Sequence, residues 1–239
     1  GVPNHRRAKE WKALAVEHPT DTAIVSESEQ EMLRTQYAVK AAHYDIAVST
    51  AGGVNSWTDE DRSLFKDISV DVPRTTISGY SRICNEEYVR QSLGRVVFIW
   101  AKDNPGVSYF QGMMDVCLVL FLVLLADHPA IKGDLNKLAV VNMRKMSPIF
   151  LREVEADVHW LFTRMMMRME SFYGHDFNAG ASHMLEEMNR IISVIDPEIW
   201  QELTEKDCRI GDFAFRWMIC LLVREFSLKR LIVLWDSYL

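Results

Sequence analysis

The segment VSYFQGMMDVCLVLFLVLLADHP, residues 107–129, decides the fold class. From Val116 to Ala126 every residue is apolar, so a helix built from this run has no face suited to water. We therefore expect a helix that is buried on all sides. The run is well short of the roughly 20 apolar residues that a bilayer-spanning helix needs, so it indicates a protein core and no transmembrane segment.

Helical patterns fill most of the remaining chain, and the β-branched runs are short and fall inside helical periods. We predict an all-α fold, a single irregular multi-helix domain over residues 1–239. The helical segments that we expect are 6–16, 26–48, 57–68, 85–106, 151–174, 181–195, 209–226 and 228–239, with a short piece after Pro197.

Helix ends can be predicted from capping residues. Thr58 or Asp59 is expected to begin the helix at 57–68, and Asn85 to cap the next long one. That helix should end at Asn104-Pro105-Gly106. Its apolar stripe is predicted to consist of Val89, Leu93, Val96, Val97 and Trp100.

Charge and composition exclude several classes of function. A net charge of −6 argues against nucleic acid as the main partner, because phosphate binding needs a basic surface. The four cysteines form no CxxC pair, which suits buried thiols in a reducing compartment, and no His or Cys spacing predicts a metal site. His159 is expected to be structural, and Met165, Met166, Met167 and Met169 to fill the core.

The segment DISVDVPRTTISG, residues 67–79, holds an arginine on a stiff piece of chain. The proline fixes its own φ and disfavours the α region for Val72, so the chain leading into Arg74 should be rigid and extended. Asp71, three residues earlier, is close enough to receive the Arg74 guanidinium. An arginine aimed in this way suits recognition of phosphate, but the same pattern also fits a structural ion pair.

A glutamine lies at the predicted start of the most apolar helix of the chain. Gln111 is followed by Gly112, which permits close approach of another backbone. The amide could point outward to position water or bind a partner, or it could be satisfied locally. The distance between Arg74 and Gln111 in sequence leaves open whether they meet.

Three short motifs in this order give the chain a family resemblance. They are RAKEW with Arg7 and Trp11, ISVDVPRT with Ile68, Asp71, Arg74 and Thr75, and YFQG with Tyr109, Gln111 and Gly112. The sequence resembles a TBC domain, a GTPase-activating protein for Rab GTPases, from Gly1 to Leu239. The segments EADVHWLFTRM, IDPEIW, FAFRWMICLLVREF and VLWDSYL are also similar to helices of that family.

The resemblance implies a role for each motif residue. Arg74 matches the family's arginine finger and Gln111 its glutamine finger, both inserted into the site of a Rab in its GTP form. Asp71 would hold Arg74, and Tyr109 and Gly112 would shape the loop that carries Gln111. Thr75 would support the same motif, and the implied role of Arg7, Trp11 and Ile68 is structural.

The resemblance also implies what the chain does not supply itself. No cofactor is expected, because GTP and magnesium would belong to the Rab. The family's vesicle-trafficking role implies a cytoplasmic location, peripheral on endomembranes. Two departures stand out: Met114 replaces an asparagine frequent in the family, and the chain stops at LWDSYL, before further C-terminal helices are expected.

Other functions remain to be weighed. A TBC-like protein could bind a Rab as an effector or scaffold without accelerating hydrolysis, although the presence of both Arg74 and Gln111 disfavours this. If the protein were a helical scaffold without a GTPase partner, the presence of both Arg74 and Gln111 would be a coincidence. A hydrolase would need a nucleophile and a base, and the sequence contains no GxSxG motif.

Overall fold

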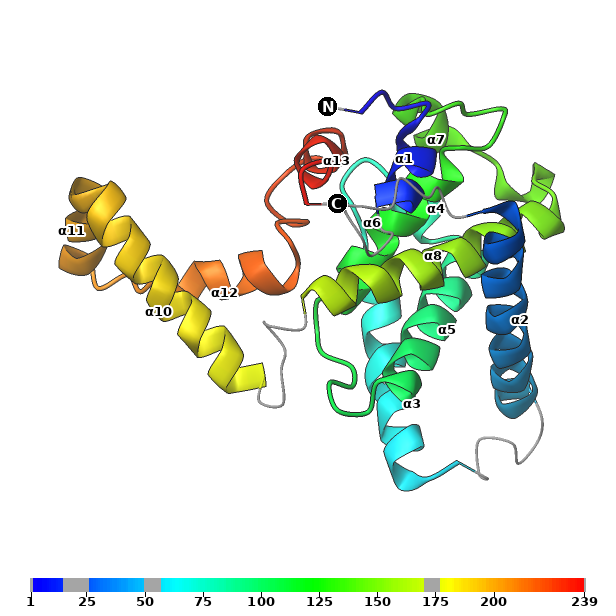
Figure 1. Cartoon of the computed structure of the whole chain (residues 1–239), viewed down its shortest axis with the longest axis horizontal. Helices are drawn as coiled ribbons and strands as arrows, with labels where there is room; N and C mark the ends of the chain where they lie inside the picture. Colours follow the sequence, from blue (N-terminus) through cyan, green and yellow to red (C-terminus); the bar gives the residue numbers. More distant parts are fainter. Residues whose placement is uncertain (1, 15–25, 50–56, 170–176, 239) are drawn as a thin grey trace.

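The computed structural model describes residues 2–14, 26–49, 57–169 and 177–238. Its regular elements are all helical in these ranges, which confirms the predicted all-α class (Figure 1). The expected extension of the first helix to 16 and the end of the 151–174 helix lie outside the described residues. The α-helices are α1 (Arg7–Leu14), α2 (Glu27–Ser49), α3 (Asp59–Asp71), α4 (Ser81–Cys84), α5 (Glu87–Asp103), α6 (Met113–Leu125), α7 (Leu135–Val140), α8 (Pro148–Arg168), α10 (Phe177–Ile195), α11 (Pro197–Glu205), α12 (Gly211–Ile219) and α13 (Leu228–Trp235), and the two 3₁₀ turns are η2 (Val72–Arg74) and η3 (Met143–Lys145).

Helix α6 lies at the centre of the core. Every residue from Met113 to Leu125 is buried, as the apolar run predicted. The helix packs against α8 and α5, and α2 covers α8 and α5 on the outer side (Figure 1). Burying each large aliphatic side chain stabilises the fold by about 1.5–3 kcal/mol, so this helix is a dominant source of the folding free energy.

Helix α5 shows where the capping prediction held and where it failed. Its predicted stripe is buried, and Asn104 is its C-cap. The N-cap is Glu86 and not Asn85, because the short helix α4 precedes it and Asn85 ends that helix. The Asn85 amide oxygen accepts a hydrogen bond from Arg90 Nη2 at 2.5 Å instead. Thr58 does cap α3, accepting from the backbone N–H of Asp61 at 3.1 Å.

Helix α8 supplies both apolar and charged groups to the interior. Met165, Met166 and Met169 are buried as predicted, whereas Met167 is exposed. The His159 ring lies 4.8 Å from that of Tyr37, and burial lowers its pKa to about 4, which keeps the imidazole neutral. This environment agrees with a structural histidine.

A buried carboxylate joins α8 to two neighbouring helices. Glu155 accepts hydrogen bonds from Tyr37 Oη at 2.6 Å, Ser92 Oγ at 2.5 Å and Arg95 Nε at 2.6 Å. Burial acts to raise the pKa of Glu155, but the hydrogen bond and charge of Arg95 outweigh it and the pKa is lowered. The ionised carboxylate is thus satisfied, and it fixes the register of α2, α5 and α8.

The two ends of the chain meet at one aspartate. Asp236, just after α13, accepts from Arg7 Nε at 2.8 Å, from Trp11 Nε1 at 2.9 Å and from the backbone N–H of Val2 at 2.8 Å. Arg7 and Trp11 are buried, and the Trp11 and Trp235 rings lie 6.0 Å apart. The RAKEW motif does not indicate what Arg7 and Trp11 bind, and the structure shows that both donate to Asp236.

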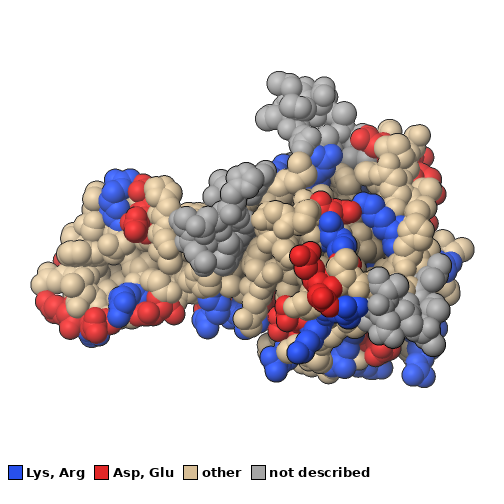
Figure 2. All heavy atoms as spheres, turned by 90° about the horizontal axis from the view of Figure 1, so that it is seen from below, with Lys and Arg blue, Asp and Glu red and all other residues tan. Residues whose placement is uncertain are grey.

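Helices α10 and α11 form an arm beside this body, connected to it through α12 and α13 (Figure 1). Figure 2 shows one face of the molecule, on which acidic and basic side chains are interspersed over the body. The exclusion of nucleic acid as main partner stays a prediction.

The aspartate between the chain ends is expected to matter for stability. Asp236→Ala leaves the Arg7 guanidinium buried without its carboxylate, and such a loss costs about 3 kcal/mol. Urea unfolding should show it as a lower midpoint with an unchanged slope. Glu10→Gln is the matched control, because the Arg6–Glu10 pair is solvent-exposed and should contribute less than about 0.5 kcal/mol. A loss below about 1 kcal/mol for Asp236→Ala would contradict this role.

Candidate functional site

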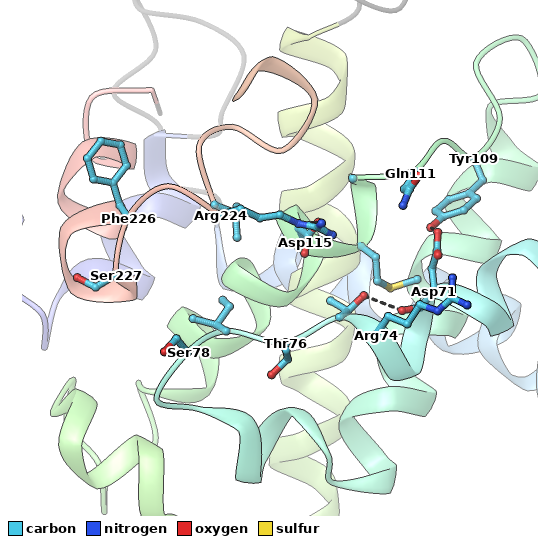
Figure 3. A pocket seen from close by; sticks show the side chains of 15 residues that line it. Asp71, Arg74, Thr76, Ser78, Tyr109, Gln111, Asp115, Arg224, Phe226 and Ser227 are labelled. Carbon is cyan, nitrogen blue, oxygen red and sulfur yellow. Dashed lines mark hydrogen bonds and ion pairs between the residues drawn. The ribbon is translucent and has the colours of Figure 1, made fainter. Parts of the chain in front are cut away.

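A cleft of about 420 Å³ opens on the surface where three distant segments meet. One segment follows α3, the second precedes α6, and the third lies between α12 and α13 (Figure 3). Both Arg74 and Gln111 line this cleft and both are exposed. The lining residues are Asp71, Arg74, Thr75, Thr76, Ile77, Ser78, Tyr109, Gln111, Gly112, Met114, Asp115, Val223, Arg224, Phe226 and Ser227.

Arg74 lies on a 3₁₀ turn that continues α3. The Thr75 backbone N–H donates to the carbonyl of Asp71 at 3.1 Å, and Thr75 Oγ1 donates to the same carbonyl at 2.9 Å. Ile68, in the last turn of α3, is buried and packs this helix against the core. The Arg74 backbone is therefore rigid.

The conformation of this segment differs from the predicted extended one. Val72 adopts the right-handed helical region, with φ −48° and ψ −52°, although a proline follows it. Its side chain packs over Gly94 of α5, where a Cβ would lie 3.4 Å from Val72 Cγ2. Packing and the bonds from Thr75 outweigh the local preference before proline.

Asp71 contacts a different partner from the one expected. Its carboxylate accepts a hydrogen bond from Tyr109 Oη at 2.6 Å, and the described residues show no ion pair between it and Arg74. Burial and the bond to Asp71 raise the pKa of Tyr109 well above its usual value, so the phenol remains a donor. Asp71 therefore joins the Arg74 segment to the Gln111 segment and leaves the guanidinium exposed at the cleft.

Gln111 precedes the buried helix instead of opening it. Helix α6 begins at Met113, and Gly112 is its N-cap. Within the described part of the chain, the Gln111 side chain makes no hydrogen bond, and it faces the cleft (Figure 3). The alternative of a locally satisfied amide is not what the structure shows.

Gly112 is required by both its backbone and its neighbours. Its φ is +115°, a conformation that residues with a Cβ rarely adopt. A Cβ at this position would lie 3.2 Å from the carbonyl oxygen of Ile219 and 3.2 Å from Cys220 Sγ. The sequence-based expectation of a close backbone approach at Gly112 is therefore confirmed.

A charged pair completes the cleft. Asp115, buried in the first turn of α6, accepts from Arg224 Nη2 at 2.9 Å and Nε at 3.1 Å. Burial and the charge of Asp115 raise the pKa of Cys220 to about 12, so its thiol stays protonated 3.6 Å from the carboxylate. Arg224 was not predicted from the sequence. The signal that could have indicated a basic partner was Asp115, a single acidic residue directly before the apolar run.

The motif residues thus fall into two groups. All the residues named for the second and third motifs except Ile68 line the cleft, whereas Ile68 is buried in the core and Arg7 and Trp11 lie at the junction of the chain ends. Across the described residues no set of three or more His, Cys, Asp and Glu side chains is arranged to hold a metal ion. No helix described by the structure has both the length and the apolar character to cross a membrane.

A model of the Rab-GTPase-TBC domain matches residues 5–239. The chain belongs to this family. The TBC domain of this chain is 26% identical over its full length to TBC1 domain family member 22B of Homo sapiens and to GTPase-activating protein GYP1 of Saccharomyces cerevisiae. It spans 44% and 36% of those two proteins, less than half of each.

A solved structure shares the fold of this TBC domain. The structure is described as the Ypt/Rab-GAP domain of Gyp1p, and it superposes with a TM-score of 0.82 at 25% identity. The match covers 100% of this chain and 70% of the Gyp1p chain. This likeness confirms the predicted TBC fold.

Gly112 gives a direct test of the geometry beside the cleft. Gly112→Ala should lower the free energy of unfolding by about 1–3 kcal/mol, because the new Cβ strains the backbone and meets Ile219 and Cys220. Denaturant unfolding measures the change. Gly106→Ala, with open space around its Cβ, is the control and should remain within about 1 kcal/mol of the parent. Equal effects of the two substitutions would show that Gly112 is not constrained as described.

Proposed function

We propose that this TBC domain accelerates GTP hydrolysis by a Rab-family GTPase, with Arg74 and Gln111 entering the GTPase site together. The observation that carries the proposal is their convergence: the two residues are distant in sequence, yet they line one cleft and both are exposed. The description of the relative GYP1 as a GTPase-activating protein, and of the solved Gyp1p structure as a Ypt/Rab-GAP domain, supports the same function.

Arg74 suits the stabilisation of charge on the transferring phosphoryl group. A guanidinium is planar, always charged and able to donate two parallel hydrogen bonds to phosphate oxygens. Its segment is held rigid by Thr75, and no ion pair within the described residues competes for the charge. A pre-positioned arginine of this kind contributes about 10³–10⁵ in rate, or about 4–7 kcal/mol.

Gln111 suits the positioning of the attacking water. In ordinary small GTPases a glutamine of the GTPase itself does this. We propose that Gln111 takes over that task, which its exposed amide and the fixed backbone of Gly112 make sterically reasonable. Asp71 and Tyr109 would keep the two contributing segments together through their 2.6 Å hydrogen bond.

The partner would be a Rab in its GTP form, and the nucleotide and magnesium ion would belong to that partner. This chain would therefore act as an activator that lends residues in trans. We further propose that it works in the cytoplasm at endomembrane surfaces, where Rabs control vesicle trafficking. A Rab-binding scaffold without activation remains the competing function, and the same assays distinguish it.

The first kinetic prediction concerns Arg74. Arg74→Ala should reduce stimulated hydrolysis by about 10³-fold or more, and Arg74→Lys should restore little, because an ammonium lacks the planar fork. Single-turnover hydrolysis on a panel of GTP-loaded Rabs gives the rate, and circular dichroism checks the fold. Arg144→Ala removes another exposed arginine, outside the cleft, and should have no effect. If Arg74→Ala stimulates hydrolysis to within a few-fold of the parent, Arg74 is not the arginine finger.

The second kinetic prediction concerns Gln111. A Rab whose own switch glutamine is changed to leucine should still be stimulated by the parent domain. Gln111→Ala should be severely impaired on both forms of the Rab, because no second glutamine is correctly placed. The measurement is the saturating hydrolysis rate for the four combinations of parent and variant partners.

The contrary result for Gln111 is equally distinct. If Gln111 only helps to bind the Rab, the Rab variant resists the domain, and Gln111→Ala mainly raises the concentration for half-maximal stimulation. If the parent domain binds GTP-loaded Rabs and stimulates none of them, the scaffold function replaces the proposed one.

A further inference from the structure

A charged pair that the motif residues do not include lies one helical turn from Gln111. Asp115 is only 4% exposed, and Arg224 donates two hydrogen bonds to its Oδ2 atom, from Nη2 at 2.9 Å and from Nε at 3.1 Å. Arg224 comes from the segment between α12 and α13, far along the chain, and it lines the cleft with its side chain half-exposed. The pair therefore connects the start of α6 to the C-terminal part of the domain (Figure 3).

Asp115 depends on Arg224 for its charge balance. A buried carboxylate is costly unless it is paired and hydrogen-bonded. Among the described residues, the other side chain that donates to Asp115 is the Cys220 thiol at 3.6 Å, a weak donor. Without Arg224, Asp115 would lose its charged partner, and the start of α6, which Gln111 closely precedes, would no longer be held to the segment after α12.

The segment that carries Arg224 is held in an uncommon conformation. Helix α12 ends at Ile219, short of the helix predicted to Phe226, because Leu221 and Leu222 both have positive φ, 47° and 64°. Two hydrogen bonds of 2.9 Å stabilise this corner, from the Leu222 N–H to the Trp217 carbonyl and from Trp235 Nε1 to the Leu221 carbonyl. Strained residues of this kind persist where the surroundings fix them.

The corner has a consequence for the glutamine. It places Ile219 and Cys220 against Gly112, and it directs Arg224 to Asp115. The Gln111 side chain has no hydrogen bond within the described residues, so its position is set by the residues on either side of it, Tyr109 before it and Gly112 to Asp115 after it. We propose that Arg224 and Asp115 are positioning residues for Gln111, a role that rests on the proposed GTPase activation and extends it.

The kinetic test asks whether the effect of Arg224→Gln depends on the presence of Gln111. Arg224→Gln should lower the saturating rate of stimulated hydrolysis about 10- to 100-fold, the effect of misplacing a catalytic group by about 1 Å. The concentration for half-maximal stimulation should change little. In the Gln111→Ala background the same substitution should cause no further loss. An equal loss in both backgrounds would overturn the proposal, because Arg224 would then act independently of Gln111.

Two matched variants separate positioning from general damage. Arg216→Gln removes an exposed arginine of α12 that pairs with Glu225, and it should leave the rate unchanged. The double variant Asp115→Asn with Arg224→Gln replaces the ion pair by two neutral amides and should recover part of the rate lost in Arg224→Gln. If Arg224→Gln does not fold, the saturating rate of the double variant is compared with that of Asp115→Asn alone. A double variant that is no faster than Asp115→Asn contradicts the proposal.

A structural measurement keeps the inference testable if no Rab is stimulated. Amide hydrogen exchange of the peptide covering residues 107–116 should become faster in Arg224→Gln, whereas peptides from α8 should keep their protection. In Arg216→Gln both regions should match the parent. Unchanged exchange at 107–116 would show that the pair does not hold the Gln111 segment, whatever the outcome of the GTPase assays.

Discussion

The complete burial of α6 is the constraint on which the rest of the structure depends. A helix without a polar face must be surrounded, so α5, α8 and α1 pack around it. At its N-terminus the chain leaves the core directly before the helix, between the exposed Gln111 and the buried Gly112. Gly112 turns the backbone outward with φ +115°, and Gln111 emerges at the surface as a direct result.

The cleft depends on contacts between segments that are distant in sequence. The Arg74 turn continues α3, whereas Gln111 and Arg224 lie outside the regular helices. Each is fixed by a hydrogen bond to a residue far away in sequence, Tyr109 to Asp71 and Arg224 to Asp115. Such an arrangement leaves the arginine and glutamine side chains exposed on rigid backbones, which is what insertion into a partner's site requires.

The charged groups in the interior have separate tasks. Asp236 joins the two chain ends, Glu155 joins three helices, and Asp115 joins the start of α6 to the corner after α12. Each is buried with an arginine as partner, because an unpaired carboxylate there would be costly. Only the third lies beside the cleft, so its loss should affect function more specifically than the loss of the other two.

The sequence by itself determined the all-α class, the buried helix, the stripe of α5 and the close approach at Gly112, because each depends on local periodicity or on the lack of a Cβ. The motif order also singled out Arg74 and Gln111. Only the tertiary structure decided that the two share a cleft, that Asp71 binds Tyr109, and that Val72 is helical before a proline. It also decided that Arg224 pairs with Asp115 and that Asp236 receives Arg7. These contacts join residues far apart in the chain, and their energies outweigh local preferences that a sequence pattern can express.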